Sequence, residues 1–327
     1  NNSWTSHRLN SFRFIWERLI IFICNFFSKK NLFQVSIANT GTDLSKHPLV
    51  QQADVIHLHW VNQGFLSLSD IKKLVNTGKP IVWTMHDLWP ATAICHYPGG
   101  CEKYISNCYQ CPMLKRNPFF DLAASVFKEK GKIGLSKITF VGCSRWIMEE
   151  AKKGNWLRTA CFTSIPNPID VTAFKRMEKR VAQDRIEIVL MGNSSEELIS
   201  QFPFKVNTLG YISDQDSMIS VYACADMFVI PSLEDNLPNT IMESMACGTP
   251  CVGFETGGIP EMIDHLKNGY VAKYKDTEDL AEGIKWIIDS RESLQLSEAC
   301  IRKVHDCYQE SVVAGRYIDL YRSLTSP

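Results

Sequence analysis

Residues 227–243 read MFVIPSLEDNLPNTIME, and this stretch decides the class of fold. Its first four residues form an apolar run of strand length, and Pro231 to Leu237 form a polar loop. Pro238 then opens a helix, because proline suits the first turn of a helix, and Gly248 supplies the stop. A strand that leads through a short loop into a helix is the repeating unit of parallel α/β folds.

Other apolar runs along the chain have the same character, and helix-like patterns separate them. Buried parallel strands read as continuous runs rich in valine and isoleucine, so the alternation predicts βαβ units in doubly wound sheets. The clearest helix starts at Asp276 and Thr277, which can cap it, and its apolar face holds Leu280, Ile284, Ile287 and Ile288. The further predicted strands are Val55–Leu58, Ile81–Met85, Ile138–Val141, Ile186–Met191 and Pro250–Phe254.

The length of 327 residues favours two domains, because a single hydrophobic core rarely grows that large. The segment Ile165–Asp170 contains two prolines, which forbid helix and favour extended backbone. We therefore expect one domain over residues 1–168 and another over 169–327, with the final helix packing back on the first domain.

Composition narrows the partners and the compartment. Lysine and arginine number 35, as do aspartate and glutamate, so the balance excludes a strongly basic nucleic-acid binder and favours a small or neutral partner. Twelve cysteines spread through a long chain without a visible cleavable signal indicate a reducing cytoplasm.

The apolar run Leu19–Phe27 is too short to span a membrane. Arg13, Arg18, Lys29 and Lys30 flank it, and Phe12, Phe14, Ile15 and Trp16 stand beside it. Two interpretations of Phe12–Lys30 stay open: an ordinary buried helix, and a peripheral contact with the inner face of the membrane.

The loop of residues 231–237 carries the polar groups that point to chemistry. In open α/β sheets, ligands bind beyond the carboxyl ends of the strands. The amides and the positive dipole at the start of the following helix suit a diphosphate. Glu234, Asp235 and Glu243 are poor phosphate ligands, but carboxylates accept hydrogen bonds strongly from sugar hydroxyls.

These residues resemble the signature of the family-4 retaining glycosyltransferases. That signature is a pair of acids with seven residues between them, a helix end of small residues and a Gly-Gly loop. Here it reads Asp235 through Glu243, then 246–250 as ACGTP and 257–261 as GGIPE, and it continues through Asn268-Gly269-Tyr270. The resemblance implies the GT-B architecture, in which two Rossmann-like domains face each other across a cleft.

The resemblance also implies roles for the residues of a nucleotide-sugar donor site. Asp235 would bind the hydroxyls of the donor sugar, with Glu234 as the alternative carboxylate, and Glu243 would bind the ribose. The amides around Asn236 and Leu237 would meet the diphosphate, and Asn239 is a further donor-binding candidate.

The amino-terminal half resembles a bacterial polysaccharide-synthesis subgroup of that family, through residues 54–60 (DVIHLHW) and 82–89 (VWTMHDLW). The histidine at the position of His86 faces the donor sugar in the family, so His86 and Asp235 are the catalytic candidates. His57 and His59 are weaker candidates, and we expect only one of them to face the cleft.

The implied reaction is metal-independent, hexosyltransferase-like transfer with retention of anomeric configuration. The acceptor would be a saccharide or a lipid-linked saccharide of a growing surface polysaccharide such as capsule. Two other functions stay open: a nucleotide-sugar-binding module without turnover, and a glycoside hydrolase or phosphorylase.

Four cysteines gather within seventeen residues: Cys95, Cys101, Cys108 and Cys111. In a cytoplasmic protein this grouping favours a tetrahedral, structural zinc site over disulfides, with His96 as a spare ligand. The alternative is a set of unbound or transiently oxidised thiols.

The chain departs from the family pattern in two places. It lacks the opening strand and glycine-rich loop, and only eleven residues separate Phe174 from Ile186, where the family has a strand and a basic pair. The basic residues there, Lys175, Arg176, Lys179 and Arg180, lack the family context and receive no role. We expect the natural protein to be longer than the 327 residues.

Overall fold

The computed structural model describes residues 3–117, 119–176, 186–290 and 294–326. The chain forms two compact units, which we describe separately. Unit 1 comprises residues 1–166, 234–237 and 314–327, and unit 2 comprises residues 167–233 and 238–313.

Unit 1 is built on a four-stranded parallel sheet in the order β1-β2-β3-β4. The strands are β1 (Ile56–Leu58), β2 (Ile81–Met85), β3 (Thr139–Gly142) and β4 (Cys161–Ser164). The first three confirm predicted runs, and β2 is buried along its whole length. Sequence patterning missed β4 because this edge strand, CFTS, is half polar and only partly buried.

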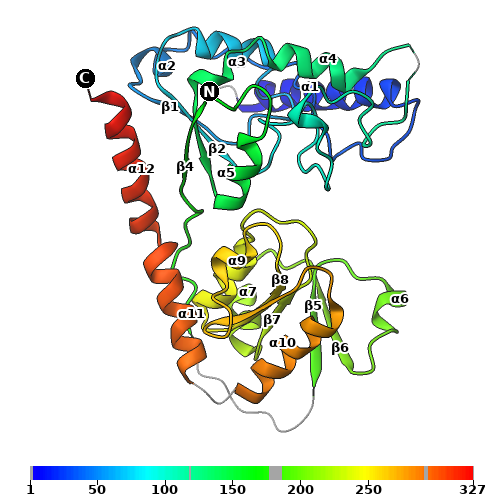
Figure 1. Ribbon diagram of the computed structural model, residues 1–327, viewed down its shortest axis with the longest axis vertical. Helices are drawn as coiled ribbons and strands as arrows, with labels where there is room; N and C mark the ends of the chain where they lie inside the picture. The colour runs from blue at the N-terminus through cyan, green and yellow to red at the C-terminus, as the bar shows by residue number, and fades with distance from the viewer. Residues whose placement is uncertain (1–2, 118, 177–185, 291–293, 327) are drawn as a thin grey trace. The chain divides into compact units, whose positions relative to one another are not determined.

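Figure 1 shows the helices of unit 1, and several of them begin where the sequence supplies a capping side chain. Ser67 forms a capping box with Asp70, and the side chains of Asp121 and Ser144 accept backbone N–H groups of the helices that they precede. The helices are α1 (Ser3–Cys24), α2 (Pro48–Gln52), α3 (Leu68–Val75), α4 (Leu122–Lys130) and α5 (Arg145–Lys152), with the part of α12 (Glu310–Thr325) from Ala314 onward.

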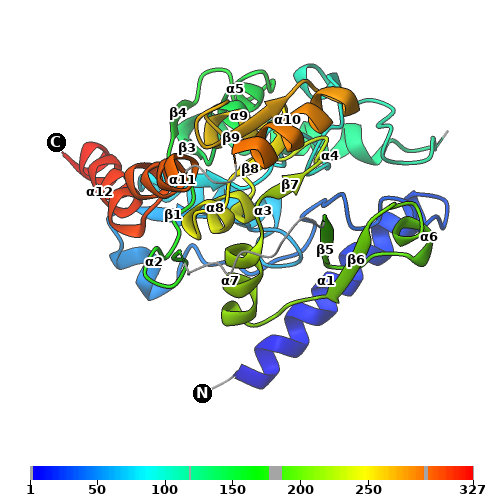
Figure 2. The ribbon, with the colours of Figure 1, turned by 90° about the horizontal axis from the view of Figure 1, so that it is seen from below.

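Helix α1 buries one face and exposes another. The Glu17 carboxylate accepts the amides of Ile37 (2.7 Å) and Ala38 (2.8 Å), and Arg18 donates to the Val35 carbonyl (2.8 Å). The amino-terminal half of α1 extends away from the sheet of its unit (Figure 2). Large apolar side chains stand exposed on the helix: Phe12, Ile15, Trp16, Leu19 and Ile23. Phe14 instead stacks on Phe33. The helix thus combines a buried face with an uncovered apolar one.

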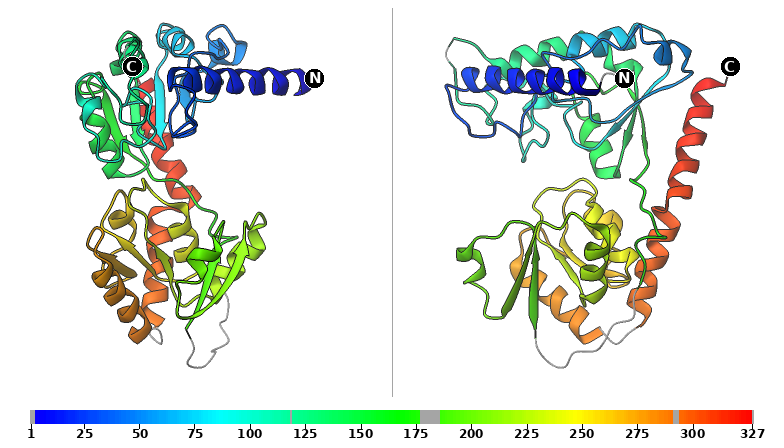
Figure 3. Two further views of the ribbon diagram at one scale, coloured as in Figure 1. Left: turned by 90° about the vertical axis from the view of Figure 1, so that its right-hand side faces the viewer. Right: turned by 180° about the vertical axis from the view of Figure 1, so that it is seen from behind.

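Unit 2 contains two parallel sheets. One pairs β5 (Glu187–Met191) with β6 (Lys205–Gly210), and the other has the order β7 (Phe228–Ile230), β8 (Cys251–Phe254), β9 (Gly269–Ala272). Figure 3 shows the β5–β6 pair in green, set apart from the golden three-stranded sheet. The predicted strands at 186–191, 227–230 and 250–254 are confirmed. Strand β6, which is largely polar, and the four-residue strand β9 were not predicted.

Helices of unit 2 follow each strand. The predicted cap of α10 is confirmed, since the Asp279 amide donates to Asp276 Oδ1 (3.0 Å), and α10 packs on β8 and β9. These helices are α6 (Glu196–Ile199), α7 (Gln215–Cys224), α8 (Asn239–Ala246), α9 (Ile259–Met262), α10 (Thr277–Ser290) and α11 (Leu294–Cys307). Within the described residues, no helix combines the length and apolar character needed to cross a bilayer.

Candidate functional site

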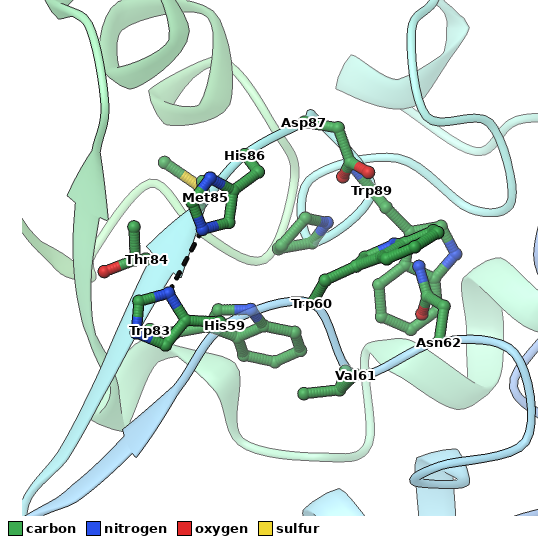
Figure 4. A pocket seen from close by; sticks show the side chains of 11 residues that line it. His59, Trp60, Val61, Asn62, Trp83, Thr84, Met85, His86, Asp87 and Trp89 are labelled. Atoms are coloured by element: carbon green, nitrogen blue, oxygen red, sulfur yellow. Dashed lines mark hydrogen bonds between the residues drawn. The ribbon is translucent and has the colours of Figure 1, made fainter. Parts of the chain in front are cut away.

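Polar and aromatic side chains gather in unit 1 at the carboxyl ends of β1 and β2. They line a small hollow, which Figure 4 shows with His59, Trp60 and Asn62 on one side and His86 and Asp87 on the other. Its volume of about 10 Å³ matches roughly one water molecule. The hollow alone is therefore too small to hold a sugar, although its rim presents the predicted residue His86.

Three histidines at the carboxyl ends of β1 and β2 form one connected group: His57, His59 and His86. His59 Nδ1 lies 3.1 Å from His86 Nε2, and the rings of His57 and His59 are 4.2 Å apart. The expectation that only one of His57 and His59 faces this side was wrong. Residues two apart along an extended chain point to the same face, so both rings lie together.

Burial lowers the pKa of all three histidines, so the group is neutral near pH 7. Burial, with a smaller contribution from the neighbouring His59 and His86, lowers the pKa of His57 to about 4. Partial burial also lowers the pKa of His59, and it lowers that of His86 against the opposing effect of Asp87. Since His59 and His86 face each other through ring nitrogens, one must donate and the other must accept.

The end of helix α12 completes the histidine group. The Tyr321 hydroxyl lies 2.6 Å from His57 Nδ1, and the Tyr317 hydroxyl lies 2.8 Å from Thr84 Oγ1. Thr84 Oγ1 in turn lies 2.8 Å from His57 Nε2. Sequence reasoning missed both tyrosines, because they are more than two hundred residues from the histidines in the chain.

Asn236 anchors the segment 234–237 within unit 1. This 4% exposed side chain accepts a hydrogen bond from Ser144 Oγ (2.6 Å) and donates weakly toward the carbonyls of Met85 (3.4 Å) and His86 (3.3 Å). Ser144 also caps α5. The segment is thereby fixed to the same strand ends that carry His86.

The neighbouring acids are half-buried and oriented by main-chain donors. Glu234 Oε2 accepts the Gly99 amide (3.1 Å), and the Asp235 carboxylate accepts the Asn236 amide. Burial raises the pKa of both carboxyls. The Asn236 amide, which was expected to meet a diphosphate, therefore already serves Asp235, while buried Leu237 leads into α8.

Glu243 lies on helix α8 of unit 2. Its Oε2 accepts a hydrogen bond from the Tyr222 hydroxyl (2.9 Å). Burial raises the pKa of Glu243, and this hydrogen bond partly opposes the increase. Asn239, the first residue of α8, is exposed, and its Oδ1 accepts from Asn167 Nδ2 at 3.3 Å. Glu243 is thus held by one side-chain donor, which sequence reasoning did not identify.

The basic residues after Phe174 do not lie beside the start of α8. The Lys175 amide donates to the Cys247 thiol, and the Arg176 side chain lies close to Gly248, at the carboxyl end of the helix. Lys179 and Arg180 are outside the described residues. Within the described part of unit 2, the basic pair next to Phe174 therefore belongs to the opposite end of α8 from Asn239.

Cys95, Cys101, Cys108 and Cys111 lie together in unit 1, around one cavity that Tyr104 also lines. All twelve cysteines of the chain are free thiols. Over the described residues, no group of three or more histidine, cysteine or acidic side chains is arranged, as it stands, to hold a metal ion. His96, expected as a spare ligand, instead pairs with Asp87 Oδ2 at 2.6 Å.

Residues 169–290 match the family model described as "Glycosyl transferases group 1". This range runs from the first residues of unit 2 to the end of α10, and it includes the Asp235–Glu243 stretch.

Two curated relatives and one solved structure show the same likeness. The chain is 28% identical over 142 residues to N,N'-diacetylbacillosaminyl-diphospho-undecaprenol alpha-1,3-N-acetylgalactosaminyltransferase of Campylobacter jejuni, covering 42% of this chain and 38% of that protein. It is 22% identical over 259 residues to the putative colanic acid biosynthesis glycosyl transferase WcaC of Escherichia coli, covering 66% and 62%. The alignments thus span less than two thirds of each relative.

The solved structure is Anabaena HepE in complex with UDP. It superposes with a TM-score of 0.58 at 14% identity, covering 84% of this chain and 81% of that chain. The fold class predicted from the sequence, α/β of the GT-B type, is confirmed.

Proposed function

We propose that the protein is a glycosyltransferase that moves a sugar from a nucleoside-diphosphate sugar to a hydroxyl acceptor. The observation that carries this proposal is the family match, because its 122-residue range contains the acid pair Asp235 and Glu243 on a strand–loop–helix unit. That HepE was solved with UDP supports a nucleotide ligand for this fold.

Each acid receives a separate part of the donor in this proposal. Asp235, with Glu234 as its neighbour, accepts hydrogen bonds from sugar hydroxyls, and Glu243 accepts them from the ribose. Tyr222 favours this role, because its hydroxyl orients the Glu243 carboxylate (2.9 Å). His86 is neutral, so it can accept or donate one hydrogen bond near the anomeric carbon without adding charge.

The transfer exchanges one bond at the anomeric carbon for another. The bond to the diphosphate oxygen breaks, the acceptor oxygen bonds to the same face, and its proton leaves with the diphosphate. Comparing the anomeric configuration of the donor with that of the product by NMR tests retention. The first amides of α8 stabilise the departing diphosphate, and the reaction needs no metal at this site.

Incubation with a panel of nucleotide sugars, with release of nucleoside diphosphate as the readout, tests the proposal. Hydrogen bonds to a charged group are worth about 1.5–3 kcal/mol, so Glu243→Gln should lower kcat/KM by roughly 10- to 150-fold. Glu278→Gln, an exposed acid in the first turn of α10, is the matched control and should leave turnover unchanged. Equal turnover in the two variants would refute the assignment.

The same assay separates the alternatives. Nucleotide binding by calorimetry without diphosphate release from any donor would favour a binding module without turnover. Release of free sugar from oligosaccharides would favour a hydrolase. A hydrolase needs two carboxylates that flank the scissile bond, with one of them protonated. The hydrolase is disfavoured because Asp235 and Glu243 instead belong to one strand–loop–helix unit.

We further propose a saccharide or lipid-linked saccharide acceptor in surface-polysaccharide synthesis, such as capsule, at the cytoplasmic face of the membrane. Two observations support this location. The Campylobacter relative is named for a diphospho-undecaprenol substrate, and α1 exposes a stripe of apolar side chains followed by Lys29 and Lys30.

A further inference from the structure

The four-cysteine cluster (Cys95, Cys101, Cys108 and Cys111) closes around a single cavity that the donor site does not use. All four thiols line it, together with Tyr104, and none forms a disulfide. Its volume of about 10 Å³ leaves room for one occupant of about the size of a water molecule. This size suits a single ion better than an organic ligand or a metal cluster.

Two of these sulfurs accept main-chain hydrogen bonds. The Ala93 amide donates to Cys108 and the Met113 amide donates to Cys111, and each bond opposes the larger effect of burial, which raises the pKa of both thiols. Donors aimed at sulfur stabilise negative charge, and such outer contacts orient the ligands of metal centres.

Lys130 fixes the backbone that leads into the cluster. This last residue of α4 is 1% exposed, and its Nζ donates to the carbonyls of Trp89 (2.6 Å) and Thr92 (2.9 Å). These contacts hold the segment that runs into Cys95. Burial lowers the pKa of Lys130 well below its usual value, so its amine adds no fixed charge to the cluster.

We propose that the four-cysteine cluster binds one zinc ion as four thiolates. Each thiol gives up its proton to water when the ion binds, because the thiolate is the form that coordinates zinc. Soft thiolate ligands and a closed four-sulfur set select zinc over magnesium, calcium or manganese. Because the thiols are not yet arranged to hold an ion, binding must draw them together.

The position of the cluster gives the ion a structural role at the donor site. Cys95 and Cys101 bracket a short loop, in which His96 pairs with Asp87 (2.6 Å) and the Gly99 amide holds Glu234 (3.1 Å). Four protein ligands leave no open position for substrate. The ion would therefore fix the loop that orients Glu234, without taking part in the reaction.

Elemental analysis of the full chain, purified without chelators, tests the proposal. We expect about one zinc ion per chain and, after cobalt replacement, the intense visible absorption of tetrahedral cobalt thiolate. Four thiols should be protected from a thiol reagent until a chelator is added. A folded protein, by circular dichroism, without stoichiometric zinc even after growth with added zinc would overturn the proposal, as would recovery of these cysteines as disulfides.

Matched variants separate the ligands from the rest of the chain. Cys101→Ser and Cys111→Ser should each abolish stoichiometric zinc, whereas Cys161→Ser, on exposed β4, should retain it. These readouts need no donor or acceptor, so they stand apart from the proposed transferase activity.

Discussion

Replacing His57 with glutamine should make unit 1 less sensitive to acid. In the folded protein the pKa of His57 lies at about 4, against an ordinary value of 6.5, because of burial and the adjacent His59 and His86. The hydroxyls of Tyr317 and Tyr321 and the Thr84 side chain complete its surroundings and carry no charge near neutral pH.

The sign of the effect follows from proton binding. Between pH 6.5 and about 4 the unfolded chain protonates His57 while the folded chain resists, so the free energy of unfolding falls as the pH falls. Each tenfold difference in proton affinity is worth about 1.4 kcal/mol, which gives an upper limit of about 3.4 kcal/mol. His57 is only half-buried, so solvent screening reduces the expected effect to about 1–2 kcal/mol.

Denaturant unfolding followed by tryptophan fluorescence measures the free energy of unfolding of unit 1, which contains His57. Seven of the eight tryptophans belong to unit 1, and only Trp286 belongs to unit 2. At pH 7.5, His57→Gln should be less stable than the wild type, because glutamine cannot reproduce the ring contacts with both Thr84 and Tyr321. At pH 4.5 the difference in unfolding free energy between variant and wild type should be smaller by about 1–2 kcal/mol, since the variant lacks the titrating group.

A control and a refuting result complete the design. His305→Gln, at an exposed position on α11, should leave the gap from the wild type constant across the same pH range. A constant or widening gap for His57→Gln would show that the folded protein does not suppress protonation of His57.

Three further predictions concern the candidate site. Asn236→Ala leaves the buried Ser144 hydroxyl without its acceptor and should cost about 1–3 kcal/mol of unfolding free energy, whereas an unchanged denaturation midpoint would contradict the anchoring role. Tyr222→Phe removes the donor to Glu243 and should raise the pKa of that carboxyl further. As the pH is lowered, nucleotide affinity measured by calorimetry should therefore begin to fall at a higher pH than in the wild type. Identical pH profiles would argue against this role of Tyr222. Trp16→Ser should weaken binding to anionic vesicles in a flotation assay but leave nucleotide affinity intact, and unchanged flotation would exclude this helix from membrane contact.

The sequence predicted those parts of the fold that depend on local patterning. Strands β2 and β8 are continuous apolar runs, and α10 carries its own cap at Asp276, so neighbouring residues suffice to predict them. Strand β4 was not predicted, because its polar CFTS sequence becomes a strand only by pairing with β3. Periodicity was also misapplied to His57 and His59, which share a face as residues two apart must.

Some residues of the candidate site could likewise be identified from the sequence, whereas their partners could not. The four cysteines could be named from their spacing, and Glu243 and His86 from the family resemblance of the motifs that contain them. Only the tertiary structure places Tyr321 against His57, Ser144 against Asn236 and Lys130 against the carbonyls of Trp89 and Thr92. Local sequence determines which side chains are available and which element carries them. The partners that set their charge and orientation come from distant segments, since burial and pairing depend on how the whole chain packs.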